Sequence, residues 1–117
     1  MIPTQTDIVL RLAELSRLLD AATVEVAVLD EEAVRAKQAH EVASARAYLT
    51  AEGSIEARKA TAVLQAADLA LASDLAAAKH RACRERINTL RSQLSIGQTL
   101  SAAIRNQFMA EPIGQHT

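Results

Sequence analysis

The chain has 117 residues, with 13 Lys and Arg against 14 Asp and Glu, so its formal net charge is −1. This length suits one domain, and the near-neutral charge excludes a global field that would draw the chain to nucleic acid or anionic lipid. Half of the residues are hydrophobic but only 2% are aromatic, which indicates thin helix–helix seams rather than a thick globular core. Three glycines and two prolines are too few for the turns of a β-rich fold.

The chain has a single cysteine, Cys83, which excludes an internal disulfide framework and is typical of a reducing compartment. The N-terminal residues show no basic segment followed by an apolar core. Charged residues interrupt every apolar run before it reaches membrane-spanning length. We therefore expect a soluble cytoplasmic protein with no membrane partner.

The first predicted element is a long helix over residues 7–50, after a lead-in of residues 1–6 in which Thr4 or Thr6 caps the helix. An apolar ladder alternates steps of four and three along this segment, which places it on one stripe of a helix. A stripe of this length requires a partner helix to cover it. The ladder consists of Ile8, Leu12, Leu15, Leu19, Ala22, Val26, Leu29, Ala33, Ala36, His40, Ala43 and Ala47.

The second predicted element is a turn over residues 51–54, where Gly53 suits the end of one helix and Ser54 the N-cap of the next. A loop this short makes the two flanking helices antiparallel neighbours. The second helix is predicted over residues 55–109, and two alternatives stay open at Gly97, a bend or a continuous helix. Breakers after that helix predict a disordered tail over residues 111–117, namely Pro112 and Gly114.

The second helix also carries an apolar stripe, which changes phase midway. Its members are Leu64, Ala67, Leu71, Leu75, Ala78 and Ala82, followed by Cys83, Ile87, Leu90 and Leu94. Folding the chain about Gly53 places Leu12 near Leu94 and Leu29 near Ala78, so that residues 100–110 extend past their partner. The predicted fold is an all-α, long antiparallel helical hairpin over residues 7–110, a two-helix coiled coil that associates into a helical bundle.

Some apolar residues are left uncovered by such a hairpin, and soluble monomers rarely tolerate large exposed apolar patches. On the first helix we expect Leu18, Val24 and Val28 to form the self-association surface of a homo-oligomer, most simply a dimer. On the second helix we expect Leu100, Ile104 and Phe108 to bind a protein partner, whose identity the sequence does not give.

A basic segment of the second helix has two interpretations. It comprises Lys79, Arg81, Arg84, Arg86 and Arg91, with Arg105 further on. Such a segment can neutralise phosphates of a nucleic acid, although no aromatic residue lies among the bases to stack on them. Alternatively it pairs with the acidic first helix, because residues 1–53 carry 5 basic and 9 acidic side chains and residues 54–117 carry 8 and 5. We favour this charged seam, since opposite charges flanking an antiparallel pair fix its alignment.

No catalytic signature is present. His80 and Cys83 lie three residues apart, but two ligands do not make a zinc site, and no base is arranged to activate the thiol. We expect His40 and Cys83 to be seam residues instead. The chain lacks a glycine-rich phosphate loop, a nucleophile elbow and an HExxH motif. We therefore predict a non-enzyme with no metal and no cofactor.

Two stretches of the chain resemble segments of known proteins. One is Ala47-Tyr48-Leu49-Thr50-Ala51-Glu52-Gly53-Ser54 with Ala57-Arg58-Lys59-Ala60, and the other is Arg86-Ile87-Asn88-Thr89-Leu90-Arg91 with residues 96–105. They resemble small, mostly uncharacterised helical proteins encoded by phages and prophages of actinobacteria, whose genes often lie among early or DNA-metabolism genes. The resemblance implies a phage protein acting in the host cytoplasm and supplies no active-site residues.

The predicted function is that of a non-enzymatic interaction or adaptor protein, a phage-encoded accessory that self-associates and binds a protein partner. Two alternatives stay open. One is a nucleic-acid-binding accessory to phage recombination or replication, and the other is an inhibitor of a host or defence protein that lays a helix in a groove.

Overall fold

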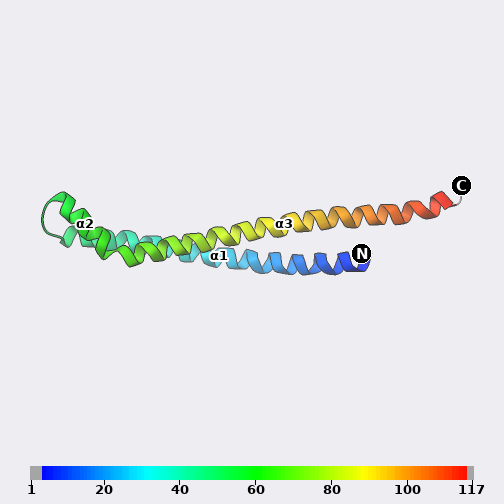
Figure 1. Cartoon of the computed structure of the whole chain (residues 1–117). Coiled ribbons are helices and arrows are strands. Elements are labelled where there is room, and N and C mark those ends of the chain that lie inside the picture. Colours follow the sequence, from blue (N-terminus) through cyan, green and yellow to red (C-terminus); the bar gives the residue numbers. More distant parts are fainter. Residues whose placement is uncertain (1–3, 116–117) are drawn as a thin grey trace. The chain divides into compact units, whose positions relative to one another are not determined.

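The computed structural model describes the backbone of residues 4–115 and the side chains of residues 4–107. Over that range the chain forms three helices and no strand: α1 (Gln5–Thr50), α2 (Ile55–Gln65) and α3 (Ala67–Gln115). Figure 1 shows α1 leading into a tight turn, with α2 and α3 as the returning arm. The predicted all-α helical hairpin is confirmed.

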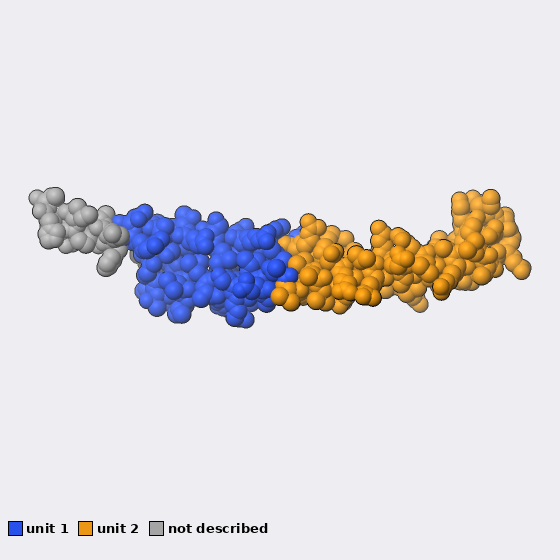
Figure 2. Space-filling model, turned by 180° about the vertical axis from the view of Figure 1, so that it is seen from behind, with its two compact units in different colours: residues 1–23, 85–117 blue, residues 24–84 orange. Residues whose placement is uncertain are grey.

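The hairpin divides into two compact units, coloured separately in Figure 2. Unit 1 consists of residues 1–23 and 85–117, and unit 2 of residues 24–84. Each unit pairs a segment of α1 with a returning segment that runs in the opposite direction. In unit 1, Gln5 Nε2 donates a hydrogen bond to Ser101 Oγ at 3.2 Å. In unit 2, His80 Nε2 lies 3.7 Å from Asp30 Oδ1.

The start of α1 is fixed by a reciprocal pair of hydrogen bonds. Asp7 N–H donates to Thr4 Oγ1 at 3.1 Å, and Thr4 N–H donates to Asp7 Oδ2 at 3.1 Å. This is a capping box, which satisfies backbone donors that the first helical turn leaves unpaired. Of the two candidate caps, Thr4 is therefore the one used, and α1 begins two residues before the expected position.

The capping box makes the start of α1 sensitive to acid. The backbone N–H of Thr4, and then its side chain, hold the pKa of Asp7 below the ordinary value of 3.8. A lowered folded-state pKa means that this contribution is present above the ordinary value and is lost as the pH falls through the folded-state pKa. We expect an NMR titration of the Asp7 carboxyl carbon to give a midpoint below 3.8, which Thr4→Ala moves upward. A midpoint that Thr4→Ala leaves unchanged would contradict the assignment.

The turn follows the residues that predict it. Gly53 has a φ of 106°, a left-handed conformation that favours glycine, and Ser54 Oγ accepts a hydrogen bond from Ala57 N–H at 3.1 Å. Arg58 then connects α2 to the end of α1 through two contacts with Tyr48. Its Nε donates to the Tyr48 carbonyl at 3.2 Å, and its guanidinium carbon lies 4.4 Å from the centroid of the Tyr48 ring.

The returning arm is interrupted at Ala66, whereas at Gly97, where the sequence left a bend or a continuous helix open, the helix is continuous. Ala66 has φ −97° and ψ 6°, and α2 and α3 are bent by 58° there. Alanine is the best helix former, so local propensity gives no sign of this break. The bend accompanies burial of both Ala62 and Ala66, which indicates that packing decides it.

The far end of the returning arm also differs from the prediction. The α3 helix is continuous through Gly97 and ends at Gln115, beyond the expected end at residue 109. Most of the expected tail over residues 111–117 is therefore helical, and residues 116–117 lie outside the described part. Helix-breaking residues give only a weak prior for where a helix ends.

The ladder of α1 is the buried stripe of this helix. All twelve of its residues are buried or half-buried, His40 included. The seam is thin, because the buried side chains are four alanines, four leucine or isoleucine residues and Cys83, and no large side chain among the described residues is fully buried. This thin seam agrees with the scarcity of aromatic side chains.

The stripe predicted for the first part of the returning arm is wrong. Leu64, Ala67, Leu71, Leu75, Ala78 and Ala82 are all exposed. Smaller residues are turned inward instead, namely Ala62, Ala66, Ala70, Ser73, Ala76 and Ala77. The facing part of α1 is itself rich in alanine, and small side chains on both helices let their axes approach closely. From Cys83 onward the predicted stripe is correct, since Cys83, Ile87 and Leu90 are buried.

Two contacts show the register of unit 1: Gln5 with Ser101, and Leu12 with Gly97. The side chain of Leu12 lies over Gly97, where a Cβ atom would meet Leu12 Cδ2 at 2.6 Å. Leu94, the predicted neighbour of Leu12, lies one turn from Gly97 on the same helix and is half-buried. Because α1 begins at Gln5, Ser101 lies alongside its start and does not extend past it.

Charged residues pair both across the hairpin and within single helices. Asp30 and His80 do meet across the hairpin. Glu31, however, pairs with Arg35 on its own helix at 2.8 Å, and Arg11 pairs with Glu14 in the same way at 3.4 Å. Exposed pairs of this kind stabilise a protein by about 0–1 kcal/mol.

Candidate interaction surfaces

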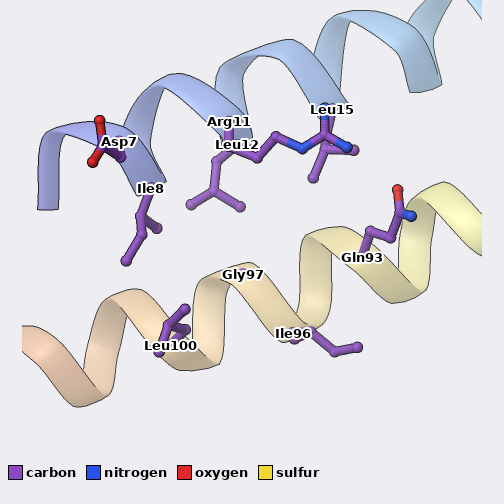
Figure 3. A pocket seen from close by; sticks show the side chains of 9 residues that line it. All are labelled: Asp7, Ile8, Arg11, Leu12, Leu15, Gln93, Ile96, Gly97 and Leu100. Atoms are coloured by element: carbon purple, nitrogen blue, oxygen red, sulfur yellow. The ribbon is translucent and has the colours of Figure 1, made fainter. Parts of the chain in front are cut away.

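An apolar groove lies in unit 1 between the start of α1 and α3; we call it the terminal groove. It has a volume of about 440 Å³. Figure 3 shows Ile8, Leu12 and Leu15 reaching from α1 toward α3, with Leu100 across from Ile8. The full lining is Asp7, Ile8, Arg11, Leu12, Leu15, Gln93, Ile96, Gly97 and Leu100. Aliphatic walls with a few polar groups at the edge suit a helix or another apolar ligand.

Gly97 forms the floor of this groove. Its missing side chain leaves room for Leu12, because a Cβ would come within 2.6 Å of Leu12 Cδ2. Sequence reasoning treated this glycine as a helix breaker. Its physical role in unit 1 is to let one helix approach the other closely.

Gly97→Ala has two opposing effects of similar size on the free energy of unfolding. Alanine favours the helix by about 1 kcal/mol, but the new methyl group must displace Leu12, and an off-rotamer side chain costs about 0.5–1.5 kcal/mol. We expect almost no change in the free energy of unfolding. In a Leu12→Ala background the conflict is absent, so the same substitution should stabilise the protein by about 1 kcal/mol. Denaturant unfolding of the wild type, the two single variants and the double variant measures this coupling between residues 12 and 97. Changes in the free energy of unfolding that are strictly additive would contradict it.

The three residues predicted to bind a partner are placed differently from one another. Leu100 is exposed and lines the terminal groove, whereas Ile104 is half-buried. The side chain of Phe108 lies outside the described residues. Sequence reasoning missed Ile96, which lines the groove and is exposed, because one exposed isoleucine carries no signal until the register is known.

A second apolar surface lies in unit 2; we call it the leucine face. It consists of the residues that the sequence assigned to the seam: Leu64, Ala67, Leu71, Leu75, Ala78 and Ala82. Leu64 is 78% exposed, Leu71 58% and Leu75 54%. Helical spacing aligns the members that belong to α3 along one side of that helix. The helical spacing of these residues was visible in the sequence. However, α3 carries two stripes, and the stripe of smaller side chains is the buried one.

The three residues predicted for self-association lie on α1. Leu18 is half-buried, and Val24 and Val28 are exposed. The two valines share one side of the helix, since they are four residues apart. Arg17 and Arg35, each seven residues from one of them, stand on the same side. This apolar patch is therefore much shorter than the leucine face.

A shallow cleft beside the turn is lined by both arms of unit 2. It measures about 590 Å³ and is lined by His40, Glu41, Ser44, Ala45, Tyr48, Lys59, Ala62 and Val63. His40 is half-buried, as expected of a seam residue.

The six basic residues considered for nucleic-acid binding are all exposed. They do not form one stripe, because Lys79 and Arg86 share one side of α3 while Arg84 and Arg91 share another. Neither unit is basic overall: residues 24–84 carry 8 basic and 9 acidic side chains, and the remaining residues carry 5 of each. An electrostatic footprint for a polyanion is thus weak.

Among the described residues, no group of three or more His, Cys, Asp or Glu side chains is arranged to hold a metal ion, and the thiol of Cys83 is buried. In the same range, no single helix is long and apolar enough to cross a membrane, although α2 and α3 satisfy the length and composition test as a bent pair.

Comparison with protein-family models, with curated proteins and with solved structures finds no match to this chain.

Proposed function

We propose that this chain is a non-enzymatic interaction protein that self-associates and binds a protein partner through its uncovered apolar surfaces. The observation that supports the proposal is the amount of aliphatic surface outside the seam. Residues as large as Leu64, Ile96 and Leu71 remain more than half exposed. Large exposed apolar patches often mark docking sites.

The partner surface in this proposal is the terminal groove. Its aliphatic walls would receive the apolar side of a helix, with Arg11 and Asp7 at the edge to contact polar groups. Leu100, one of the residues predicted to bind the partner, belongs to this lining. The resemblance to phage-encoded helical proteins supports placing this role in an infected host cell, where the chain acts as an accessory.

The alternative of nucleic-acid binding keeps one supporting observation, the exposure of all six basic residues. It predicts salt-sensitive binding that weakens when Arg84 and Arg91 become alanine, with the slope in salt reduced by each lost phosphate contact. An electrophoretic shift with single-stranded and double-stranded DNA at several salt concentrations measures this. Binding that survives both substitutions would reject the basic segment as the contact surface.

The proposal is tested by affinity capture from host lysate with matched variants. Ile96→Asp and Leu100→Asp place a charge in the terminal groove, whereas Ser95→Asp places the same charge on another side of the same helix. We expect the wild-type chain and Ser95→Asp to retain the same partner and the two groove variants to lose it. Equal capture by all four proteins, or none by the wild type, would reject the groove as the partner surface. Helical content from circular dichroism confirms that each variant is folded.

A further inference from the structure

We infer that the terminal groove of unit 1 docks the same groove of a second copy of this chain, with α1 antiparallel to α1 and α3 antiparallel to α3 across the interface. This deepens the self-association proposed above, on which it rests. It assigns that association to a surface with aliphatic walls and a charged edge (Figure 3). Residues 4–14 of α1 and 89–107 of α3 form the two halves of the surface.

The α3 wall of the groove has the spacing and the composition of a coiled-coil seam. An exposed series runs through Ile96 and Leu100 in alternating steps of four and three, the pattern in which each residue faces a partner helix. None of its members is charged. The charged residues between positions 87 and 107, Arg91 and Arg105, stand on the opposite side of α3. The series consists of Thr89, Gln93, Ile96, Leu100, Ala103 and Gln107.

This series complements itself when a second α3 runs in the opposite direction with its centre at residue 98. Ile96 then lies opposite Leu100 of the second copy, and the two-fold axis repeats this apolar layer. Burial of the two layers removes from water the most exposed aliphatic side chains of the groove. The layers further out bring no two charges together; they are Gln93 with Ala103, Thr89 with Gln107, and Arg86 with Ala110.

The position of this centre on α3 also fixes the centre on α1. Gln5 contacts Ser101, and Leu12 contacts Gly97, so residue 98 is level with residues 8–11 of α1. The two-fold axis therefore passes α1 near residue 9. The same axis that pairs the apolar layers of α3 thus determines which residues of α1 meet.

The charged edge of the groove is self-complementary about that axis. With α1 centred at residue 9, Asp7 lies opposite Arg11 of the second copy, and the axis repeats the pair. The capping box uses Asp7 Oδ2, so Oδ1 remains available to the guanidinium. Within one copy that guanidinium lies 3.4 Å from Glu14 Oε2. The remaining layer of α1 brings Thr4 to Glu14, so no like charges are opposed.

Registers that are shifted by one heptad lose the apolar layer. A shift in one direction places Ile96 opposite Gln93 of the second copy, and a shift in the other direction places it opposite Gln107. Either shift packs an amide against the isoleucine, which costs free energy unless the amide finds a hydrogen-bond partner. Of these three registers, the one centred at residue 98 is therefore favoured.

The alternative symmetry, with the two-fold axis parallel to the helices, is also less favourable. It would lay α1 on α3 of the second copy, so that Asp7 lies opposite Leu100 and Arg11 lies opposite Ile96. Each charge would then face an aliphatic side chain and not its opposite charge. Mismatches of this kind are a usual means by which an interface rejects a wrong alignment.

The first experiment measures self-association by sedimentation equilibrium of the full chain. Ile96→Asp and Leu100→Asp should each raise the dimer Kd at least about tenfold, because the two-fold axis places two carboxylates in the apolar layers. Ser95→Asp is the control, since Ser95 is also exposed but stands on another side of α3. Circular dichroism shows whether each variant keeps its helical content, and we expect it to, because Ile96 and Leu100 are exposed in the single chain.

The charged edge is tested in the same way with Arg11→Glu. This substitution opposes two carboxylates at each end of the α1 pairing and should weaken the dimer about threefold or more. Arg17→Glu makes the same charge change at an exposed position of α1 that lies outside the pairing, and should leave the Kd nearly unchanged. Equal effects of the two substitutions would contradict the pairing of Asp7 with Arg11.

The second experiment tests the register by cysteine cross-linking in a Cys83→Ala background. Gln93→Cys and Ala103→Cys change two exposed residues that face each other across the proposed interface. A mixture of the two variants should form a disulfide-linked dimer under mild oxidation. Each variant alone should link poorly, because like positions of the two copies are then about 15 Å apart along the helix axis.

The outcomes separate this inference from the proposed function. A wild-type chain that stays monomeric at all concentrations would overturn this inference, whereas a lysate partner that Ile96→Asp abolishes would still support the groove as a partner surface. An oligomer that the groove variants leave intact would overturn this inference alone and would direct self-association to Val24 and Val28. A dimer that the groove variants abolish, but in which residues 93 and 103 do not cross-link, would overturn the antiparallel register.

Discussion

Leu15→Ala is expected to lower the free energy of unfolding by about 2–3 kcal/mol, the lower half of the usual range for a buried leucine. Leu15 is 3% exposed and packs in the seam of unit 1. A thin seam can partly collapse onto the space that the missing side chain leaves, which reduces the cost. Chemical denaturation gives the total change. Hydrogen exchange should show that amides of residues 5–23 and 85–107 lose more protection than those of residues 24–84.

The matched control for this substitution is Leu10→Ala. Leu10 is on the same helix but is 64% exposed, and leucine and alanine have similar helix propensities. We expect this substitution to change the free energy of unfolding by about 0.5 kcal/mol or less. If both substitutions cost the same, Leu15 is not a seam residue and the stripe on α1 has been placed on the wrong side of the helix.

Ala22→Leu is expected to destabilise the hairpin by about 1–3 kcal/mol through overpacking. Ala22 is 1% exposed, and its methyl group is all that the approach of the two helices accommodates. A leucine there must push the axes apart or adopt a strained rotamer. Thermal unfolding followed by circular dichroism measures the effect as a lowered Tm.

Ala21→Leu makes the same chemical change at the neighbouring, exposed position. Because propensity and hydrophobicity change equally in both variants, the difference between them isolates packing. We expect Ala21→Leu to leave the stability within about 0.5 kcal/mol of wild type. Greater destabilisation by Ala21→Leu than by Ala22→Leu would mean that the helix is rotated relative to the described structure.

Both apolar surfaces affect the stability of the chain. A hairpin with a thin seam buries little apolar area per residue, and small folds of this kind commonly depend on association for stability. A dimer formed through the terminal groove would link folding to concentration and would cover Ile8 and Leu12, which line both the seam and the groove. A partner on the leucine face would add to this. Function and stability are therefore coupled in this proposal.

Part of the candidate surfaces could be predicted from sequence and part could not. The residues of the leucine face were predicted to form a helical stripe, and Leu100, which was predicted to contact a partner, lines the terminal groove. Their surroundings were assigned wrongly. Hydrophobicity alone favours leucine over alanine for the buried side, but it does not account for the separation of the two helix axes, which the facing alanines of α1 reduce.

The sequence by itself determined the long first helix, its buried ladder, the turn at Gly53 and Ser54, and the antiparallel return, because these follow from local periodicity and capping within a few residues. The tertiary structure decided the bend at Ala66, the position of Leu12 over Gly97, and which of two stripes on the returning helix is covered. Those features depend on how closely two helices can approach, which is a property of both surfaces together and not of either segment alone.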